Sequence, residues 1–112
     1  MDVATARERL KSMLAELDRS IGVLRGDSLA VRERDRSPAD GGSDLTDSDR
    51  NRALLEVATR HRHSVLEALR RMDEGGYGLC VDCGAPVPES RLEARPEAAR
   101  CVPCQSRRER RR

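Results

Sequence analysis

Residues 80–104 read CVDCGAPVPESRLEARPEAARCVPC, and this stretch decides how the chain folds. It holds all four cysteines, which form two Cys-x2-Cys pairs separated by seventeen residues: Cys80 and Cys83, then Cys101 and Cys104. Each pair forms a tight turn that places two sulfurs on one side, and two such turns supply the four corners of a tetrahedron around zinc. Gly84 permits the turn after the first pair. Because all four coordination positions are filled, we predict one structural zinc ion rather than a catalytic one.

A pair of redox-active Cys-x2-Cys motifs is the competing interpretation of these cysteines. A thioredoxin-like motif needs a βαβ setting, and the sequence contains no convincing parallel strands. We therefore expect no enzyme activity. A thiol- or zinc-based stress sensor remains an alternative function, because zinc-bound thiolates can be oxidised with loss of the metal.

Upstream of the cysteines, residues 3–24 carry apolar side chains at the alternating spacing of three and four that is typical of a coiled-coil seam. The members of this seam are Val3, Ala6, Leu10, Met13, Leu17 and Leu24, widened by Leu14 and Ile21. Gly22 and Gly26 weaken the helix by ~1 kcal/mol each relative to Ala. The helix either kinks there or continues toward residue 36.

A second helix is predicted from Thr46, a favourable N-cap, to Glu74. Its seam consists of Leu54, Ala58, His61, Val65, Ala68 and Met72, broadened by Leu55, Leu66 and Leu69. Gly75 and Gly76 follow it and are typical of a helix C-terminus. His61 and His63 lie two residues apart on different helix faces, so we expect neither to bind the metal.

Residues 37–45 connect the two helices, because Pro38 blocks helix continuation and Gly41-Gly42 favours a turn. The fold class is therefore mainly α, an antiparallel coiled-coil helical hairpin over residues 1–76 with a small C-terminal C4 zinc-finger module over 77–104 and an Arg-rich tail over 105–112. The alternative is a coiled coil between two chains. The loop chemistry favours a hairpin and hence a monomer.

Composition agrees with an architecture that needs little core, since the 112 residues include one Tyr, no Trp and no Phe, and 38% are charged. The net charge is only +2, but residues 37–49 hold four Asp and no basic residue, whereas residues 105–112 hold five Arg and one Glu. The basic tail allows an alternative function as a nucleic-acid-binding zinc module. No signal peptide or membrane span is recognisable, so we expect a cytoplasmic protein without membrane contact.

Residues 77–105 resemble the C4 zinc finger of the DksA/TraR family. The similarity includes the specific stretch RLEARP at residues 91–96. Val81 stands where the family usually has an acidic residue or Ser, and Val87 stands where it has Ile. Together with the hairpin, the resemblance covers nearly the whole chain. Longer members carry an N-terminal extension that we expect to be missing here.

The resemblance implies a non-enzymatic bacterial transcription regulator that binds RNA polymerase rather than DNA. In the family, the coiled coil enters the secondary channel of the polymerase, and its tip usually carries an Asp-x-x-Asp-x-Ala motif. The matching stretch here is SPADGG at residues 37–42, in which Asp40 fits the second acid. Ser37 replaces the first acid and Gly42 replaces the alanine. The predicted effector residues at the tip are Asp40, Ser37, Asp44 and Asp47.

Docking residues are expected among the arginines of the zinc finger and the tail, namely Arg91, Arg95, Arg107 and Arg108. Some family members also help to bind the alarmone ppGpp through basic residues. The matching positions here are Ser64, Arg95 and Gln105, of which only Arg95 is basic. This composition argues against alarmone dependence through that site.

Overall fold

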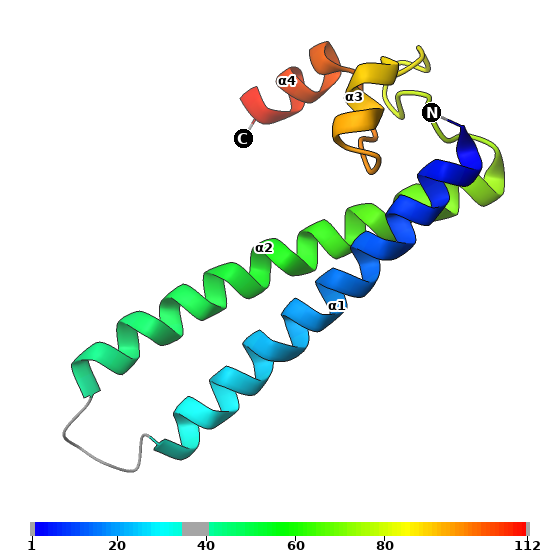
Figure 1. Ribbon diagram of the computed structural model, residues 1–112. Coiled ribbons are helices and arrows are strands. Elements are labelled where there is room, and N and C mark those ends of the chain that lie inside the picture. Colours follow the sequence, from blue (N-terminus) through cyan, green and yellow to red (C-terminus); the bar gives the residue numbers. More distant parts are fainter. Residues whose placement is uncertain (1, 35–40, 112) are drawn as a thin grey trace. The chain divides into compact units, whose positions relative to one another are not determined.

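The structure, a computed structural model, describes the backbone of residues 2–34 and 41–111 and the side chains of residues 2–26 and 47–111. Its helices are α1 (Val3–Arg34), α2 (Gly41–Glu74), α3 (Glu89–Ala94) and α4 (Val102–Arg110) (Figure 1). Within the described backbone, extended segments pair only at an isolated antiparallel bridge between Leu79 and Pro86. The prediction of a mainly helical fold is therefore confirmed.

The chain divides into two compact units. One unit combines Met1–Leu14 with His63–Arg112, and the other is Ala15–Arg62. Each unit therefore contains one segment of α1 and one segment of α2, and in each the two segments run in opposite directions (Figure 1). No helix in the part of the chain that the structure describes is long and apolar enough to cross a membrane.

Helix α1 starts at a side-chain cap that the sequence pattern had not indicated. The backbone N–H of Thr5 donates to Asp2 Oδ1 at 2.7 Å, which satisfies one of the free amides of the first turn. The hydrogen bonds from Thr5 also lower the pKa of the Asp2 carboxyl. From this start α1 continues through Gly22 and Gly26 to Arg34.

Helix α2 starts earlier than the sequence predicted but ends where expected. It begins at Gly41, so the prediction of a loop through residue 45 and of an N-cap at Thr46 is wrong. At its other end, Gly75 N–H donates to Met72 O at 3.3 Å and Gly76 N–H donates to Arg71 O at 2.9 Å. These two bonds form a Schellman motif, in which Gly75 adopts a φ of 83°.

In the first unit, α1 and α2 bury small and branched side chains between them. The buried residues here are Ala6, Leu10, Val65, Ala68 and Met72. An ion pair from Arg7 Nη1 to Asp73 Oδ1 at 3.0 Å joins the two helices beside this core. Val3 is 53% exposed, so its predicted place in the seam is wrong. At the first turn of α1 the partner helix no longer covers the apolar stripe.

In the second unit, Ile21 is buried and an ion pair from Arg62 Nε to Asp18 Oδ1 at 2.6 Å joins the two helices. Leu17, Leu24, Leu55 and Ala58 are half-buried. Leu54 is 50% exposed, and Leu66 in the first unit is also exposed, so both are wrongly assigned to the seam interior. Two helices alone cover only part of an apolar stripe, and no third layer is present in the described chain to cover the rest.

Candidate metal centre

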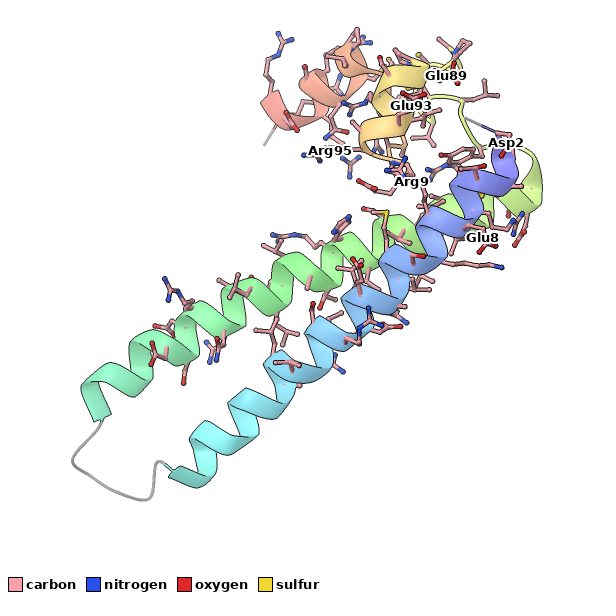
Figure 2. The ribbon with its side chains drawn as sticks, in the orientation of Figure 1. Asp2, Glu8, Arg9, Glu89, Glu93 and Arg95 are labelled. Atoms are coloured by element: carbon pink, nitrogen blue, oxygen red, sulfur yellow. The ribbon has the colours of Figure 1, made fainter. Side chains whose placement is uncertain are left out.

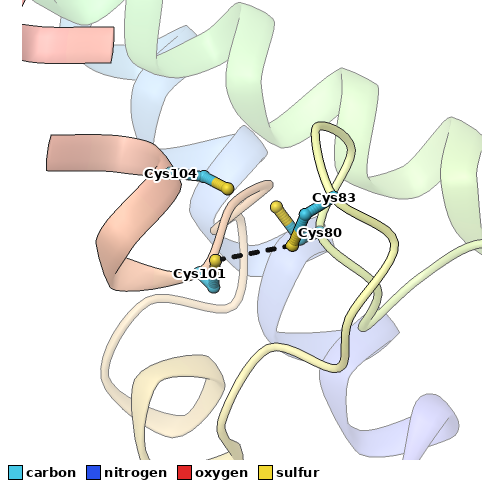
Figure 3. A group of neighbouring side chains, drawn as sticks. All are labelled: Cys80, Cys83, Cys101 and Cys104. Carbon is cyan, nitrogen blue, oxygen red and sulfur yellow. Dashed lines mark hydrogen bonds between the residues drawn. The ribbon is translucent and has the colours of Figure 1, made fainter. Parts of the chain in front are cut away.

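The first pair of cysteines lies on a tight backbone turn that follows the end of α2. Cys80 N–H donates to Ala85 O at 2.8 Å, and Gly84 N–H donates back to Cys80 O at 2.9 Å. Gly84 has a φ of 77°, a left-handed conformation that other residues rarely adopt, and this confirms the role predicted for it. The turn holds the side chains of Cys80 and Cys83 on the same side (Figure 3).

The second pair lies at the start of α4. Cys101 is the N-cap residue, Pro103 occupies the first turn, and Gln105 N–H donates to Cys101 O at 3.0 Å. Proline is favoured in this position because its missing N–H would have no helical partner there. Cys104 lies one turn into the helix, so both sulfurs are close to its positive end, where negative charge is stabilised.

Two hydrogen bonds link the two cysteine turns, and a third joins α3 to the second turn. Val81 N–H, between the first two cysteines, donates at 2.9 Å to the carbonyl of Ala99, two residues before Cys101. Arg100 Nε donates to Asp82 Oδ2 at 2.8 Å across the same junction. Arg91 Nε donates to Arg100 O at 2.9 Å from α3. These bonds link the same two turns that carry the four sulfurs.

The four sulfurs form one cluster (Figure 3). All four Sγ atoms lie within 4.8 Å of one another, and Cys83 Sγ lies 3.8 Å from Cys101 Sγ. A tetrahedral site with metal–sulfur distances of ~2.3 Å has edges of about 3.8 Å. The cysteines are not joined by disulfides. The cluster therefore fits a C4 zinc site, with Cys83 as its solvent-exposed ligand position.

The pKa values of two of these thiols are shifted in opposite directions. Burial raises the pKa of Cys80, but backbone hydrogen bonds from Cys101, Cys83 and Asp82 outweigh it and lower the pKa to about 6. Hydrogen bonding with Cys101 and burial raise the pKa of Cys104 to about 12. Metal ligation requires all four thiolates, so binding at neutral pH must release protons from the cluster.

A small core surrounds the sulfurs. Cys80, Cys104 and Val87 are its buried members, and Leu92, Ala98 and Cys101 pack against them. Leu79 and Val102 are exposed and do not fill this core. Pro96 is fully buried, and its carbonyl accepts a hydrogen bond from Tyr77 Oη at 2.9 Å.

The start of α1 contacts this part of the chain through α3. Arg9 Nη1 donates to Glu93 O at 2.7 Å, and Figure 2 shows Arg9 and Glu93 at the place where the two helices approach each other. Arg95 lies nearby at the end of α3 and is exposed. Arg91 is only half-exposed, and its Nε is bonded to a backbone carbonyl, as described above.

Only two of the four residues predicted for the tip lie among the residues that the structure describes. Ser37 and Asp40 lie outside the described residues. Asp44 is described by its backbone alone, in the first turn of α2, and Asp47 is an exposed residue of the same helix. The structure therefore does not test their predicted role.

Sequence reasoning located the four cysteines but missed the side chains that support them. Arg107 Nη2 donates to Cys104 Sγ at 3.2 Å, although Arg107 is an exposed residue like its neighbour Arg108. Pro103, a residue favoured in the first turn of a helix, was the signal for this contact, because a helix that begins there places residue 107 one turn after Cys104 on the same face. The bond between Arg100 and Asp82 had no signal in the sequence, since it depends on how the two turns meet.

Residues 75–110 match the family model for the prokaryotic dksA/traR C4-type zinc finger. The structure is also similar to that of transcription factor DksA2 from Pseudomonas aeruginosa, with a TM-score of 0.84 and 32% identity. This similarity covers 99% of the present chain and 88% of the DksA2 chain. It therefore extends over the helices as well as the zinc finger and confirms the hairpin fold.

Curated relatives agree with these two matches. The RNA polymerase-binding transcription factor DksA of Caulobacter vibrioides is 45% identical over 74 residues, which cover 62% of this chain and 51% of the relative. General stress protein 16O of Bacillus subtilis is 35% identical over 72 residues, which cover 64% and 44% respectively. The chain thus spans about half the length of these relatives. Its four cysteines are those of a C4 zinc finger, positioned to bind one metal ion.

Proposed function

This chain belongs to the DksA/TraR family of C4 zinc-finger proteins, and from that premise we propose that it is a transcription regulator that binds RNA polymerase. The observation that carries the proposal is the similarity to DksA2, because it includes the paired helices and not only the cysteine cluster. A zinc finger alone is compatible with many functions. The structure shares with DksA2 the combination of this finger with a helical hairpin.

In this proposal the two parts of the chain have different roles. Cys80, Cys83, Cys101 and Cys104 hold one structural zinc ion, whose chemistry is to fix the backbone around it. The helical hairpin enters the secondary channel of the polymerase, and the residues at its tip act on the transcription complex. Arg95 and Arg108, both exposed, are suited to dock on an acidic surface of the enzyme.

We further propose that the protein is cytoplasmic and monomeric and has no catalytic activity of its own. Four cysteine ligands leave the zinc ion no open position for water or substrate. The named relatives are transcription factors or stress proteins rather than enzymes. None of these relatives is named as a nucleic-acid-binding protein or as a thiol- or zinc-based sensor.

Direct binding to RNA polymerase is the experiment that tests the proposal. The zinc-loaded protein is titrated against immobilised core polymerase by interferometry at physiological salt. We expect saturable binding that a known secondary-channel factor displaces. The absence of binding at micromolar polymerase would contradict the proposal, and binding that the competitor leaves unchanged would place the contact elsewhere on the enzyme.

The role of the tip is tested by Asp40→Asn, which removes one negative charge while preserving the size of the side chain. We expect the variant to bind polymerase nearly as well as the natural protein but to lose most of its effect on transcription. Asp49→Asn is the matched control, because Asp49 is an exposed residue of α2 outside the predicted motif. Equal loss of binding and effect in Asp40→Asn, or no loss of either, would refute this division of roles.

A further inference from the structure

One arginine of α4 contacts the metal site with its guanidinium, although the residue as a whole is exposed. Arg107, Arg108 and Arg110 all lie in the last turns of this helix. Arg107 Nη2 donates to Cys104 Sγ at 3.2 Å, through a contact that is partly buried. The side chain of Arg108 makes no hydrogen bond or ion pair with any residue that the structure describes. The neighbouring arginines thus provide a natural comparison of the same charge on the same helix.

The helix itself creates the contact. Residues three apart lie on the same face of an α-helix, so residue 107 stands one turn beyond Cys104. The sulfur that it reaches belongs to Cys104, a residue that is only 4% exposed. A guanidinium on a long flexible stem reaches this sulfur while most of the side chain stays at the surface.

The negative charge of a zinc-bound C4 site explains why a positively charged donor would stabilise it. Four thiolates around one divalent zinc ion carry a net charge of about −2. Among the groups that the structure describes, Arg107 is the arginine bonded to a ligand sulfur. Hydrogen bonds from a charged donor are stronger than those from a neutral one, and outer-shell donors orient a ligand and tune its metal.

We propose that Arg107 is a positioning residue of the zinc site, which holds the Cys104 thiolate by a charge-assisted hydrogen bond and thereby strengthens zinc binding. Its guanidinium is consequently occupied within the chain, unlike that of Arg108. The role predicted from sequence for both arginines, docking on a partner, then falls mainly to Arg108. The inference depends on the zinc site alone and is independent of polymerase binding.

Zinc affinity is the first measurement that tests the proposal. The full-length zinc-loaded protein competes for Zn²⁺ with a chromophoric chelator of known affinity, alongside Arg107→Ala, Arg107→Lys and Arg108→Ala. We expect Arg107→Ala to bind zinc about tenfold more weakly, the lower end of the range for outer-shell residues. Arg108→Ala should match the natural protein, and Arg107→Lys should recover part of the loss because it keeps a charged donor. Both alanine variants favour the helix, so unfolding of α4 does not explain a difference between them.

Replacing zinc by Co²⁺ gives a second readout, which a general effect on packing would not change. The hydrogen bond stabilises the sulfur electrons, so its loss should shift the sulfur-to-cobalt charge-transfer band to longer wavelength in Arg107→Ala. An unchanged band, unchanged zinc affinity in Arg107→Ala, or equal losses in Arg107→Ala and Arg108→Ala would each overturn the proposal. A weaker affinity confined to Arg107→Ala together with the shifted band would support it.

Discussion

At the scale of single residues, Tyr77 reports on the packing around the zinc finger. It is the only tyrosine of the chain, and its hydroxyl donates to the carbonyl of the buried Pro96 at 2.9 Å. Burial raises the pKa of Tyr77 above its ordinary value of 10.0, although the positive charges of Arg71 and Arg9 act in the opposite direction. Phenolate formation should therefore be harder in the folded protein than in the unfolded chain.

We expect the ultraviolet absorbance of phenolate to appear at higher pH in the native protein than in the same protein unfolded by denaturant. Because the folded pKa is the higher one, the corresponding stability is fully present below the unfolded pKa and is lost as pH rises through the folded pKa. Tyr77→Phe is the control and should abolish the absorbance change. Coincident titrations of native and unfolded protein would contradict the half-buried position of this side chain.

The metal centre shows which side-chain contacts can be predicted from the sequence and which cannot. The spacing of the four cysteines was sufficient to predict one C4 cluster, because two short turns can place their sulfurs in few other ways. The link between Asp82 and Arg100 was not predictable, since these residues meet only after the two turns have come together. Arg107 lies between these cases, because its contact follows from the helix once the start of α4 is known.

At the scale of elements, periodicity predicted the faces of α1 and α2 but not how far each face is covered. Leu10 and Val65 are fully buried, whereas Val3 and Leu54 continue the same stripes and remain half or more exposed. A heptad pattern describes the apolar face of one helix. How much of that face is buried depends on where the partner helix lies. Helix α3 was missed because its six residues are too few to show a period.

The C-terminus of α2 depends on one glycine more than on its neighbour. Gly75 has a φ of 83°, whereas Gly76 has no such left-handed conformation, and added methyl groups would meet no atom within 4 Å at either position. We expect Gly75→Ala to lower the free energy of unfolding by about 1 kcal/mol through backbone strain. Gly76→Ala is the matched control and should not lower it. Denaturant unfolding of the zinc-loaded proteins measures both values, and equal destabilisation would refute the Schellman assignment.

At the scale of the whole molecule, the two compact units differ in how they are stabilised. The unit that contains residues 63–112 includes the cysteine cluster, and little else is buried around the sulfurs than Val87, Leu92 and Ala98. Zinc binding to small modules contributes on the order of 10 kcal/mol of folding free energy. The unit formed by residues 15–62 has no cysteine and depends on helix packing and on the ion pair between Asp18 and Arg62.

Removal of the metal should therefore act on the two units unequally. We expect a strong chelator to abolish the amide protection of residues 77–104, including α3, and to weaken protection at the first turns of α1 and the last turns of α2. Protection within residues 15–26 and 47–62 should change little, because no ligand or buried neighbour of the cluster lies there. Hydrogen exchange followed by mass spectrometry measures each segment, and addition of excess Zn²⁺ is the control for reversibility. A uniform loss of protection along both helices would show that the zinc site and the hairpin fold as a single cooperative unit.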